Sequence, residues 1–158
     1  MSRGLAIGGF MGTGKSTIGP LLAERLKVRF VDLDAFIEEA EGVSVSEIFR
    51  QRGEGAFRQL ETSALESLSK LRPLVLALGG GTLHECGWRE LLREFDVVVL
   101  CASWDVIRRR IADDEGARPL AAQARRTPGP NDHKSQAFLE KLRLDYQLSI
   151  YRDCNARL

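Results

Sequence analysis

Residues 5–16 read LAIGGFMGTGKS, and this stretch decides the fold. Its first residues are apolar and β-prone, residues 9–16 match the pattern GxxxxGK followed by Ser or Thr, and a helical pattern runs from Lys15 to Leu26. A strand, a glycine-rich loop and a helix in this order let backbone N–H groups and the helix N-terminus surround a phosphate group. A glycine-rich turn with a chance lysine is the alternative, and the flanking strand and helix argue against it.

The loop predicts a binding site for the phosphates of ATP and for Mg²⁺. We expect Lys15 to reach the β- and γ-phosphates and the Ser16 hydroxyl to coordinate Mg²⁺. The expected nucleotide-binding residues of the loop are Gly12, Thr13, Gly14, Lys15, Ser16 and Thr17. Because GTPases, motors and ATPases share this loop, the motif predicts the phosphate site and leaves the reaction open.

Short apolar runs alternate with longer helical patterns along the rest of the chain, which predicts an α/β fold with a parallel sheet. We expect strands at residues 5–7, 28–32, 74–78 and 97–100, and the chain stops after Ala156 as a fifth would begin. The expected helices are 15–26, 35–41, 45–52, 56–70, 85–94, 104–112 and 134–151. Ser44 and Glu47 fit a capping box.

Two further segments have lengths that suggest function. The stretch between the second and third strands is longer than one crossover needs, so we interpret residues 33–61 as a substrate lobe. Residues 113–134 are rich in Arg, Ala, Pro and Gly without a sustained period, which predicts a mobile lid.

The composition predicts one globular domain over residues 1–158, since a chain of this length is too short for two ordinary cores. Lys and Arg number 23 against 22 Asp and Glu, so overall charge does not favour a nucleic-acid or membrane partner. The arginine cluster at 108–126 lacks the interleaved aromatic residues of single-strand binders.

Three cysteines without a CxxC pair indicate neither disulfides nor zinc. We find no signal-peptide pattern or apolar run of membrane-span length, and we expect a cytoplasmic monomer.

Two carboxylates end the second expected strand in the sequence Asp32-Leu33-Asp34. Residues two apart on a strand point to the same face, and the carboxyl edge of a parallel sheet is where ligands bind. One carboxylate could therefore hold Mg²⁺ and the other an acceptor molecule. The alternatives are that Asp34 caps the helix expected at Ala35 and that Asp32 is an ordinary loop carboxylate.

A basic residue and a glycine run complete the candidate site. Arg58 and Glu61 share one helix face, where an exposed i, i+3 ion pair is the alternative to a binding role. Gly79, Gly80 and Gly81 follow the third strand, where bare backbone can approach a ligand closely, although a flexible turn would have the same sequence.

Taken together, these segments resemble the shikimate kinase family. The resemblance lies in residues 9–16, in Asp32-Leu33-Asp34, in Phe57-Arg58 with Glu61, in the run 79–82 and in Arg118-Pro119-Leu120, in the family's order over nearly the whole chain. It implies a three-layer, nucleoside-monophosphate-kinase-like P-loop fold with five parallel strands, a substrate lobe and a lid. It also implies ATP-dependent phosphorylation of a shikimate hydroxyl to shikimate 3-phosphate, a step toward chorismate and the aromatic amino acids.

The resemblance implies roles for individual residues. Asp34 would bind shikimate hydroxyls and orient or deprotonate the acceptor, and Arg58 would bind the carboxylate with help from Gly79, Gly80 and Gly81. Asp32 and Ser16 would serve Mg²⁺. Arg118 would close over the transferring phosphoryl group together with Lys15, and Arg109 or a neighbouring arginine would stack on adenine.

One position departs from the family. An arginine that helps to hold the substrate carboxylate is expected four residues before Tyr151, where this chain has Gln147. Glutamine cannot supply a charge-assisted fork. Either Arg143, one helical turn earlier, replaces it, or the acceptor is another polyol acid, such as gluconate or an amino analogue of shikimate. A non-catalytic paralogue that only binds nucleotide is a further alternative.

Overall fold

The structure is a computed structural model, and it describes residues 3–84 and 87–113. In chain order its elements are β1 (Gly4–Gly9), α1 (Lys15–Leu26), β2 (Arg29–Asp32), α2 (Leu33–Glu41), α3 (Val45–Ser69), β3 (Leu74–Ala77), the 3₁₀ helix η1 (Thr82–His84), α4 (Trp88–Leu91), β4 (Phe95–Leu100) and α5 (Trp104–Asp113). The four expected strands are all present. The lid residues after Asp113, the helix 134–151 and the fifth strand lie outside the described residues.

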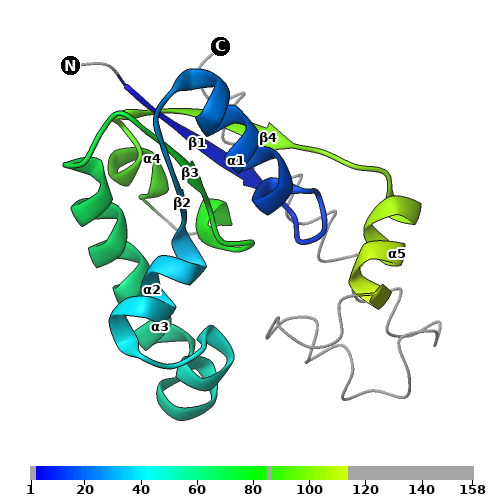
Figure 1. The fold of residues 1–158 in the computed structure, drawn as a ribbon. Helices are drawn as coiled ribbons and strands as arrows, with labels where there is room; N and C mark the ends of the chain where they lie inside the picture. Colours follow the sequence, from blue (N-terminus) through cyan, green and yellow to red (C-terminus); the bar gives the residue numbers. More distant parts are fainter. Residues whose placement is uncertain (1–2, 85–86, 114–158) are drawn as a thin grey trace.

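The four strands form one parallel sheet in the order β2-β3-β1-β4 (Figure 1). Asp32 of β2 is in register with Ala77 of β3, which is in register with Ile7 of β1. β2 and β3 therefore end at one level, and β1 runs two residues further to Gly9. The segments that follow the three strands emerge at the same edge. In parallel α/β sheets this carboxyl edge is where ligands bind.

The two faces of the sheet are covered by different helices. Ala6 and Leu76 belong to the larger core cluster, which takes in residues of α2 and α3. Ile7, which follows Ala6, and Val75, which precedes Leu76, pack with Ala23 of α1. Alternate residues of a strand point to opposite faces, so the sheet lies between α1 and the helices that follow β2. The three-layer α/β prediction is confirmed.

The expected helices 45–52 and 56–70 lie on either side of a break within α3, where Gly53 has non-helical angles (φ 79°, ψ 174°). One helix prediction differs from the structure. The expected helix 85–94 is in fact the short α4, because Gly87 has a left-handed backbone (φ 89°) at its N-cap. A left-handed residue cannot continue a right-handed helix, so the helix starts only after it.

Ser44 caps α3 as predicted, since its Oγ accepts a hydrogen bond from the Glu47 N–H at 3.2 Å. The reciprocal half of the capping box does not form. The Glu47 carboxylate instead accepts hydrogen bonds from Arg50 and Gln51, and the bond from Arg50 is the main cause that lowers the pKa of Glu47.

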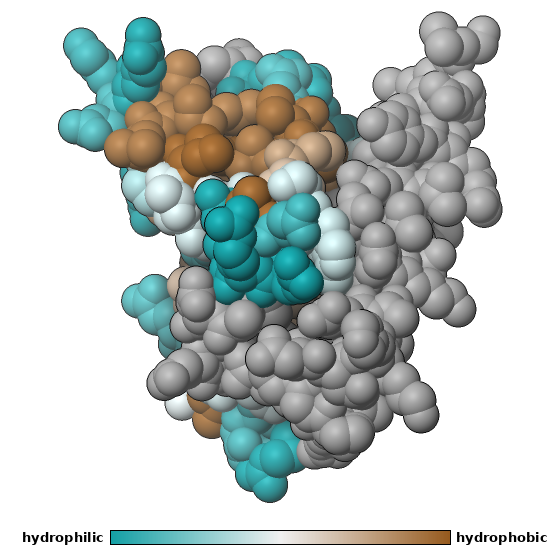
Figure 2. All heavy atoms as spheres, turned by 90° about the vertical axis from the view of Figure 1, so that its right-hand side faces the viewer, coloured by the Kyte–Doolittle hydropathy of each residue, from teal (hydrophilic) through white to brown (hydrophobic). Residues whose placement is uncertain are grey.

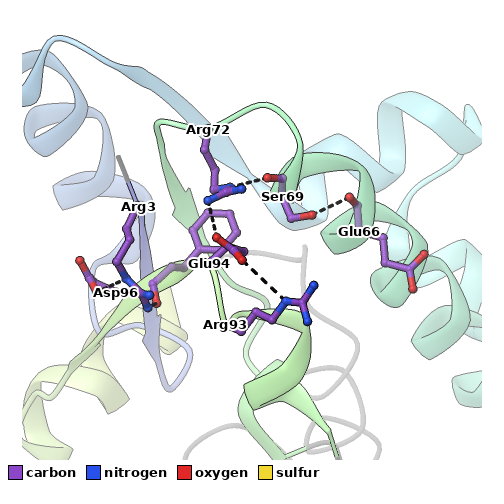
Figure 3. A network of polar contacts seen from close by, with 8 residues as sticks. Arg3, Glu66, Ser69, Arg72, Arg93, Glu94 and Asp96 are labelled. Carbon is purple, nitrogen blue, oxygen red and sulfur yellow. Dashed lines mark hydrogen bonds and ion pairs between the residues drawn. The ribbon is translucent and has the colours of Figure 1, made fainter. Parts of the chain in front are cut away.

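A polar network closes the amino edge of the sheet, opposite the ligand edge (Figure 3). Arg72 donates to the Ser69 carbonyl at 2.5 Å and to the Glu94 carboxylate at 2.6 Å, and Arg3 pairs with Asp96 at 2.7 Å. These contacts join the end of α3 to the segment before β4 and join the start of β1 to β4. These contacts stabilise the sheet and lie away from the ligand edge.

Exposed apolar side chains gather on α1 and β4, namely Ile18, Leu21, Leu26 and Val98. Figure 2 views the side of the molecule where these elements lie and shows apolar surface in its upper part. Within residues 3–84 and 87–113, no helix has the length and apolar character that a membrane span requires.

Candidate active site

A cavity of about 680 Å³ opens at the carboxyl edge of the sheet. Its walls come from the loop after β1, the end of β2, the start of α2, the middle of α3, the glycine run after β3, and Arg110 of α5. The predicted loop, carboxylates, Arg58 and glycines are thus brought together in one cavity, although they come from four separate parts of the chain.

The loop at one end of the cavity is built for phosphate. Gly14 is the N-cap of α1 with a left-handed backbone (φ 101°), and no side chain caps the helix, so the first-turn N–H groups face the cavity edge without a side-chain acceptor. Gly9 has φ 144°, and a Cβ there would lie 2.7 Å from the Leu100 carbonyl oxygen. Both positions therefore require glycine, and the N-terminus of α1 favours an anion.

Lys15 is folded back over this loop. Its Nζ donates to the Gly9 carbonyl at 2.6 Å and to the Phe10 carbonyl at 3.3 Å, and the residue is 9% exposed. The ammonium group is held beside the place where the loop would receive phosphate. Thr13 is also buried, and its hydroxyl donates to the Phe10 carbonyl at 2.7 Å, so this side chain shapes the loop from within.

Ser16 and Asp32 lie within hydrogen-bond distance of each other. The Ser16 hydroxyl donates to Asp32 Oδ2 at 3.0 Å, while Asp32 Oδ1 accepts from the N–H groups of Asp34 and Ala35 at 3.1 and 3.3 Å. Asp32 is therefore the N-cap of α2, and the alternative that Asp34 is the cap is wrong. One oxygen of Asp32 holds the helix and the other faces the loop.

No group of three or more His, Cys, Asp or Glu side chains able to hold a metal occurs in the described part of the chain. The residues present still fit Mg²⁺, which is commonly bound through one or two protein oxygens with the remaining ligands from phosphates and water. A hydroxyl and a carboxylate oxygen 3.0 Å apart beside a phosphate loop match that pattern.

Asp34 is not the helix cap, and it lies at the other end of the cavity near Gly79. A Cβ placed on Gly79 would lie 3.0 Å from Asp34 Oδ1, 3.0 Å from Glu61 Oε1 and 3.1 Å from Thr82 Oγ1. The absence of a side chain at Gly79 leaves room for these three oxygens to converge. The run is thus closely packed at Gly79, while a Cβ on Gly80 would meet nothing within 4 Å.

The Arg58 guanidinium lies between two carboxylates of its own helix, α3. Its Nη1 pairs with Glu61 at 2.5 Å and its Nη2 with Glu54 at 3.0 Å. A Cβ on Gly81 would lie 2.6 Å from Nη2, so the guanidinium lies directly over the glycine run. The predicted Arg58–Glu61 pair exists, but it is not an exposed one, since the side chains are 19% and 4% exposed.

The arginine of α5 that contacts the phosphate loop is Arg110. Its Nη1 donates to the Gly12 carbonyl at 2.9 Å and it lines the cavity. Arg109 donates to the Asp105 carbonyl of its own helix at 3.2 Å. Arg118, Arg143 and Gln147 lie outside the described residues.

Sequence reasoning missed Glu54 and gave no separate role to Thr82. The signal for Glu54 was present, because a glutamate four residues before an arginine on a helix is an ion-pair position. Thr82 was visible only as the last letter of the glycine run, and its contact with Glu61 joins two distant parts of the chain.

Comparison with known proteins decides the family. Residues 11–156 match the sequence model of the family described as shikimate kinase. The chain belongs to the shikimate kinase family. The resemblance seen in its motifs is thereby confirmed.

Individual relatives agree with this result. A curated shikimate kinase of Geobacter sulfurreducens is 51% identical over 75% of this chain and 65% of its own, and one of Sulfurihydrogenibium sp. is 38% identical over 95% and 83%. A shikimate kinase of Acinetobacter baumannii, solved in complex with shikimate, matches with a TM-score of 0.78 and 33% identity, covering 94% of this chain and 80% of that one. For three curated relatives, the Geobacter protein among them, the match spans 58–66% of their length, less than two thirds.

Proposed function

We propose that this protein transfers the γ-phosphoryl group of ATP to a hydroxyl of shikimate, giving shikimate 3-phosphate, ADP and a proton. The observation that carries the proposal is that one cavity has a phosphate loop at one end and a positioned guanidinium with a carboxylate at the other. Family membership supports it, as does the likeness to the Acinetobacter baumannii kinase that was solved with shikimate bound. The reaction belongs to chorismate and aromatic amino-acid biosynthesis.

At the nucleotide end, the loop residues Gly12–Thr17 surround the phosphates and Lys15 neutralises charge on the β- and γ-phosphates. Ser16 and Asp32 Oδ2 hold Mg²⁺, which when bound offsets the negative charge of the phosphates. Arg110 is the better candidate than Arg109 for contact with the nucleotide, because it is the one beside the loop.

At the acceptor end, Arg58 binds the shikimate carboxylate over the bare backbone of Gly79–Gly81. Asp34 accepts a hydrogen bond from the reacting hydroxyl and takes its proton as the oxygen bonds to the γ-phosphorus and the bond from phosphorus to the β,γ-bridging oxygen breaks. The proton then passes to solvent. Most of the catalysis is positioning and charge neutralisation, since phosphoryl transfer needs little covalent help from the protein.

Residues beyond Asp113 complete the proposal. Arg118 closes over the migrating phosphoryl group as part of the lid 113–134, and lid closure excludes water that would hydrolyse ATP. Arg143 takes over the carboxylate contact that Gln147 cannot make.

Gln147 is also the observation that favours a second candidate, a kinase for another polyol acid. A pocket for a different acceptor would not need the missing arginine. The two candidates differ in substrate and share the reaction.

The test is a coupled ADP-release assay of the purified protein with ATP and Mg²⁺, run with shikimate, with gluconate and without acceptor. Release that depends on shikimate and disappears in Lys15→Ala supports the proposal. Release with gluconate alone moves the assignment to the second candidate. Nucleotide binding without acceptor-dependent release indicates a non-catalytic paralogue.

The carboxylate contact is tested separately. Arg143→Ala should raise the KM for shikimate about tenfold or more while the KM for ATP changes little, because a charge-assisted contact is lost. Gln147→Arg should lower the shikimate KM. An unchanged KM in Arg143→Ala, together with weaker binding in Gln147→Arg, would indicate that the pocket is built for another acid.

A further inference from the structure

We propose that Thr82 is a positioning residue for the acceptor's carboxylate, and that it acts through Glu61 on Arg58. The inference rests on the proposed function, because it concerns how the acceptor end of that site is held. It adds a residue that is not among those lining the cavity.

The geometry is a short chain of two hydrogen bonds. The Thr82 hydroxyl donates to Glu61 Oε1 at 2.7 Å, and Arg58 Nη1 donates to Glu61 Oε2 at 2.5 Å. Each oxygen of the Glu61 carboxylate therefore has its own donor, one from the segment after β3 and one from α3. A carboxylate held at both oxygens has a defined orientation, and it passes that orientation to the guanidinium.

Because Glu61 and Thr82 are both buried, the Thr82 hydroxyl is important for holding the Glu61 carboxylate. Glu61 and Thr82 are each 3% exposed, so water cannot easily replace the hydroxyl as a donor. A buried carboxylate that loses a donor carries the desolvation cost of an unsatisfied group. Glu61 is then expected to turn toward its remaining partners, and Arg58 moves with it.

The hydroxyl is itself held in place by the glycine run. Thr82 begins η1, its backbone N–H donates to the Gly79 carbonyl at 3.3 Å, and its β-branched side chain has few allowed rotamers. The same run lies under the Arg58 guanidinium at Gly81. Through Glu61, Thr82 therefore fixes the position of the guanidinium relative to the glycine backbone that the acceptor would approach.

The Glu54 carboxylate is less suited to this role. Its side chain is 65% exposed, and an ion pair with a well-solvated partner fixes little. Of these two carboxylates, the buried Glu61 is the better placed to orient Arg58, and it is the one that meets Thr82.

The experiment compares Thr82→Ala, Thr82→Val and Thr82→Ser in steady-state kinetics with ATP and shikimate. Alanine removes the hydroxyl and reduces the side-chain volume. Valine removes the hydroxyl and keeps the volume, and serine keeps the hydroxyl. We expect both hydroxyl-free variants to raise the shikimate KM about three- to tenfold, with kcat and the KM for ATP within about twofold of wild type, and serine to restore the shikimate KM.

Thr62→Val is the matched control. Its hydroxyl lies one residue from Glu61 on the same helix but donates to the Arg58 backbone carbonyl at 3.0 Å, so the same substitution leaves the Glu61 carboxylate untouched. We expect its shikimate KM to match that of wild type.

A double-mutant cycle separates positioning from general stability. In an Arg58→Lys background, which lacks the planar fork, removal of the Thr82 hydroxyl should add no further increase in the shikimate KM. Additive effects, or equal shikimate KM values for Thr82→Ala and Thr82→Ser, overturn the inference while the proposed function stands. A wild-type protein that does not phosphorylate shikimate overturns both.

Discussion

Gly79→Ala is the substitution that most directly tests how closely the acceptor end is packed. Gly79 has no left-handed backbone angle, so alanine is conformationally allowed there, and any effect comes from contacts. The new methyl carbon would lie 3.0 Å from both Asp34 Oδ1 and Glu61 Oε1 and 3.1 Å from Thr82 Oγ1. All three oxygens would have to move, and they belong to the residues that the site depends on.

The size of the effect follows from these distances. Each oxygen must retreat by a few tenths of an ångström, and overpacking of this kind costs about 1–3 kcal/mol. For a domain of this size, that corresponds to a fall in Tm of roughly 2–12 °C. A displacement of about 1 Å costs about 10²-fold in rate, so we expect kcat/KM for shikimate to fall about tenfold or more. The KM for ATP should change little, since the phosphate loop is untouched.

Gly55→Ala is the control for exchanging glycine for alanine. A Cβ on Gly55 would meet nothing within 4 Å, and the residue lies inside α3. Alanine there should leave the kinetics unchanged and raise the free energy of unfolding by about 0.4–1 kcal/mol. Wild-type kcat/KM and Tm in Gly79→Ala would refute the close convergence of Asp34, Glu61 and Thr82.

Three further outcomes are expected. Asp34→Asn should abolish turnover while ATP still binds by calorimetry, because the amide keeps the shape and loses carboxylate basicity; near-normal turnover would remove the proton-accepting role. Arg110→Ala should raise the KM for ATP about three- to tenfold and Arg109→Ala should not, since Arg110 is the one at the loop; equal effects would refute this choice. Arg72→Ala should lower the free energy of unfolding by about 1 kcal/mol with unchanged kinetics; altered kinetics would contradict a purely structural network.

The sequence predicted the fold well because the deciding signals are local. An apolar strand followed by GFMGTGKS predicts its own strand, loop and helix, and alternation of short apolar runs with helical patterns predicts a parallel sheet. The errors occur where one residue's backbone decides. Gly87 shortened the expected helix 85–94 through its left-handed conformation, and no periodicity analysis detects that angle.

The site was predicted as a set of residues and not as a set of contacts. Asp32 and Asp34 were both expected at the end of the second strand, but which of them caps α2 depends on where the helix begins, and helix ends are poorly fixed by propensity. Likewise, the bond between Thr82 and Glu61 joins residues 21 positions apart and exists only because α3 packs beside the glycine run. Distances of this kind come from tertiary packing.

The arginine triplet 108–110 shows that some of this information was nonetheless present in the sequence. Successive helical residues are rotated by about 100°, so three consecutive arginines cannot share a face. Ile107 is the apolar residue before them, and it is buried (1% exposed) in a cluster with Phe10 and Met11 of the phosphate loop. Residues at i and i+3 lie on the same helix face, which places Arg110 on the side of Ile107 and turns Arg108 and Arg109 away. With Ile107 packed against the loop, helix geometry therefore favours Arg110 over its two neighbours, and the contact of Arg110 with the Gly12 carbonyl agrees with this.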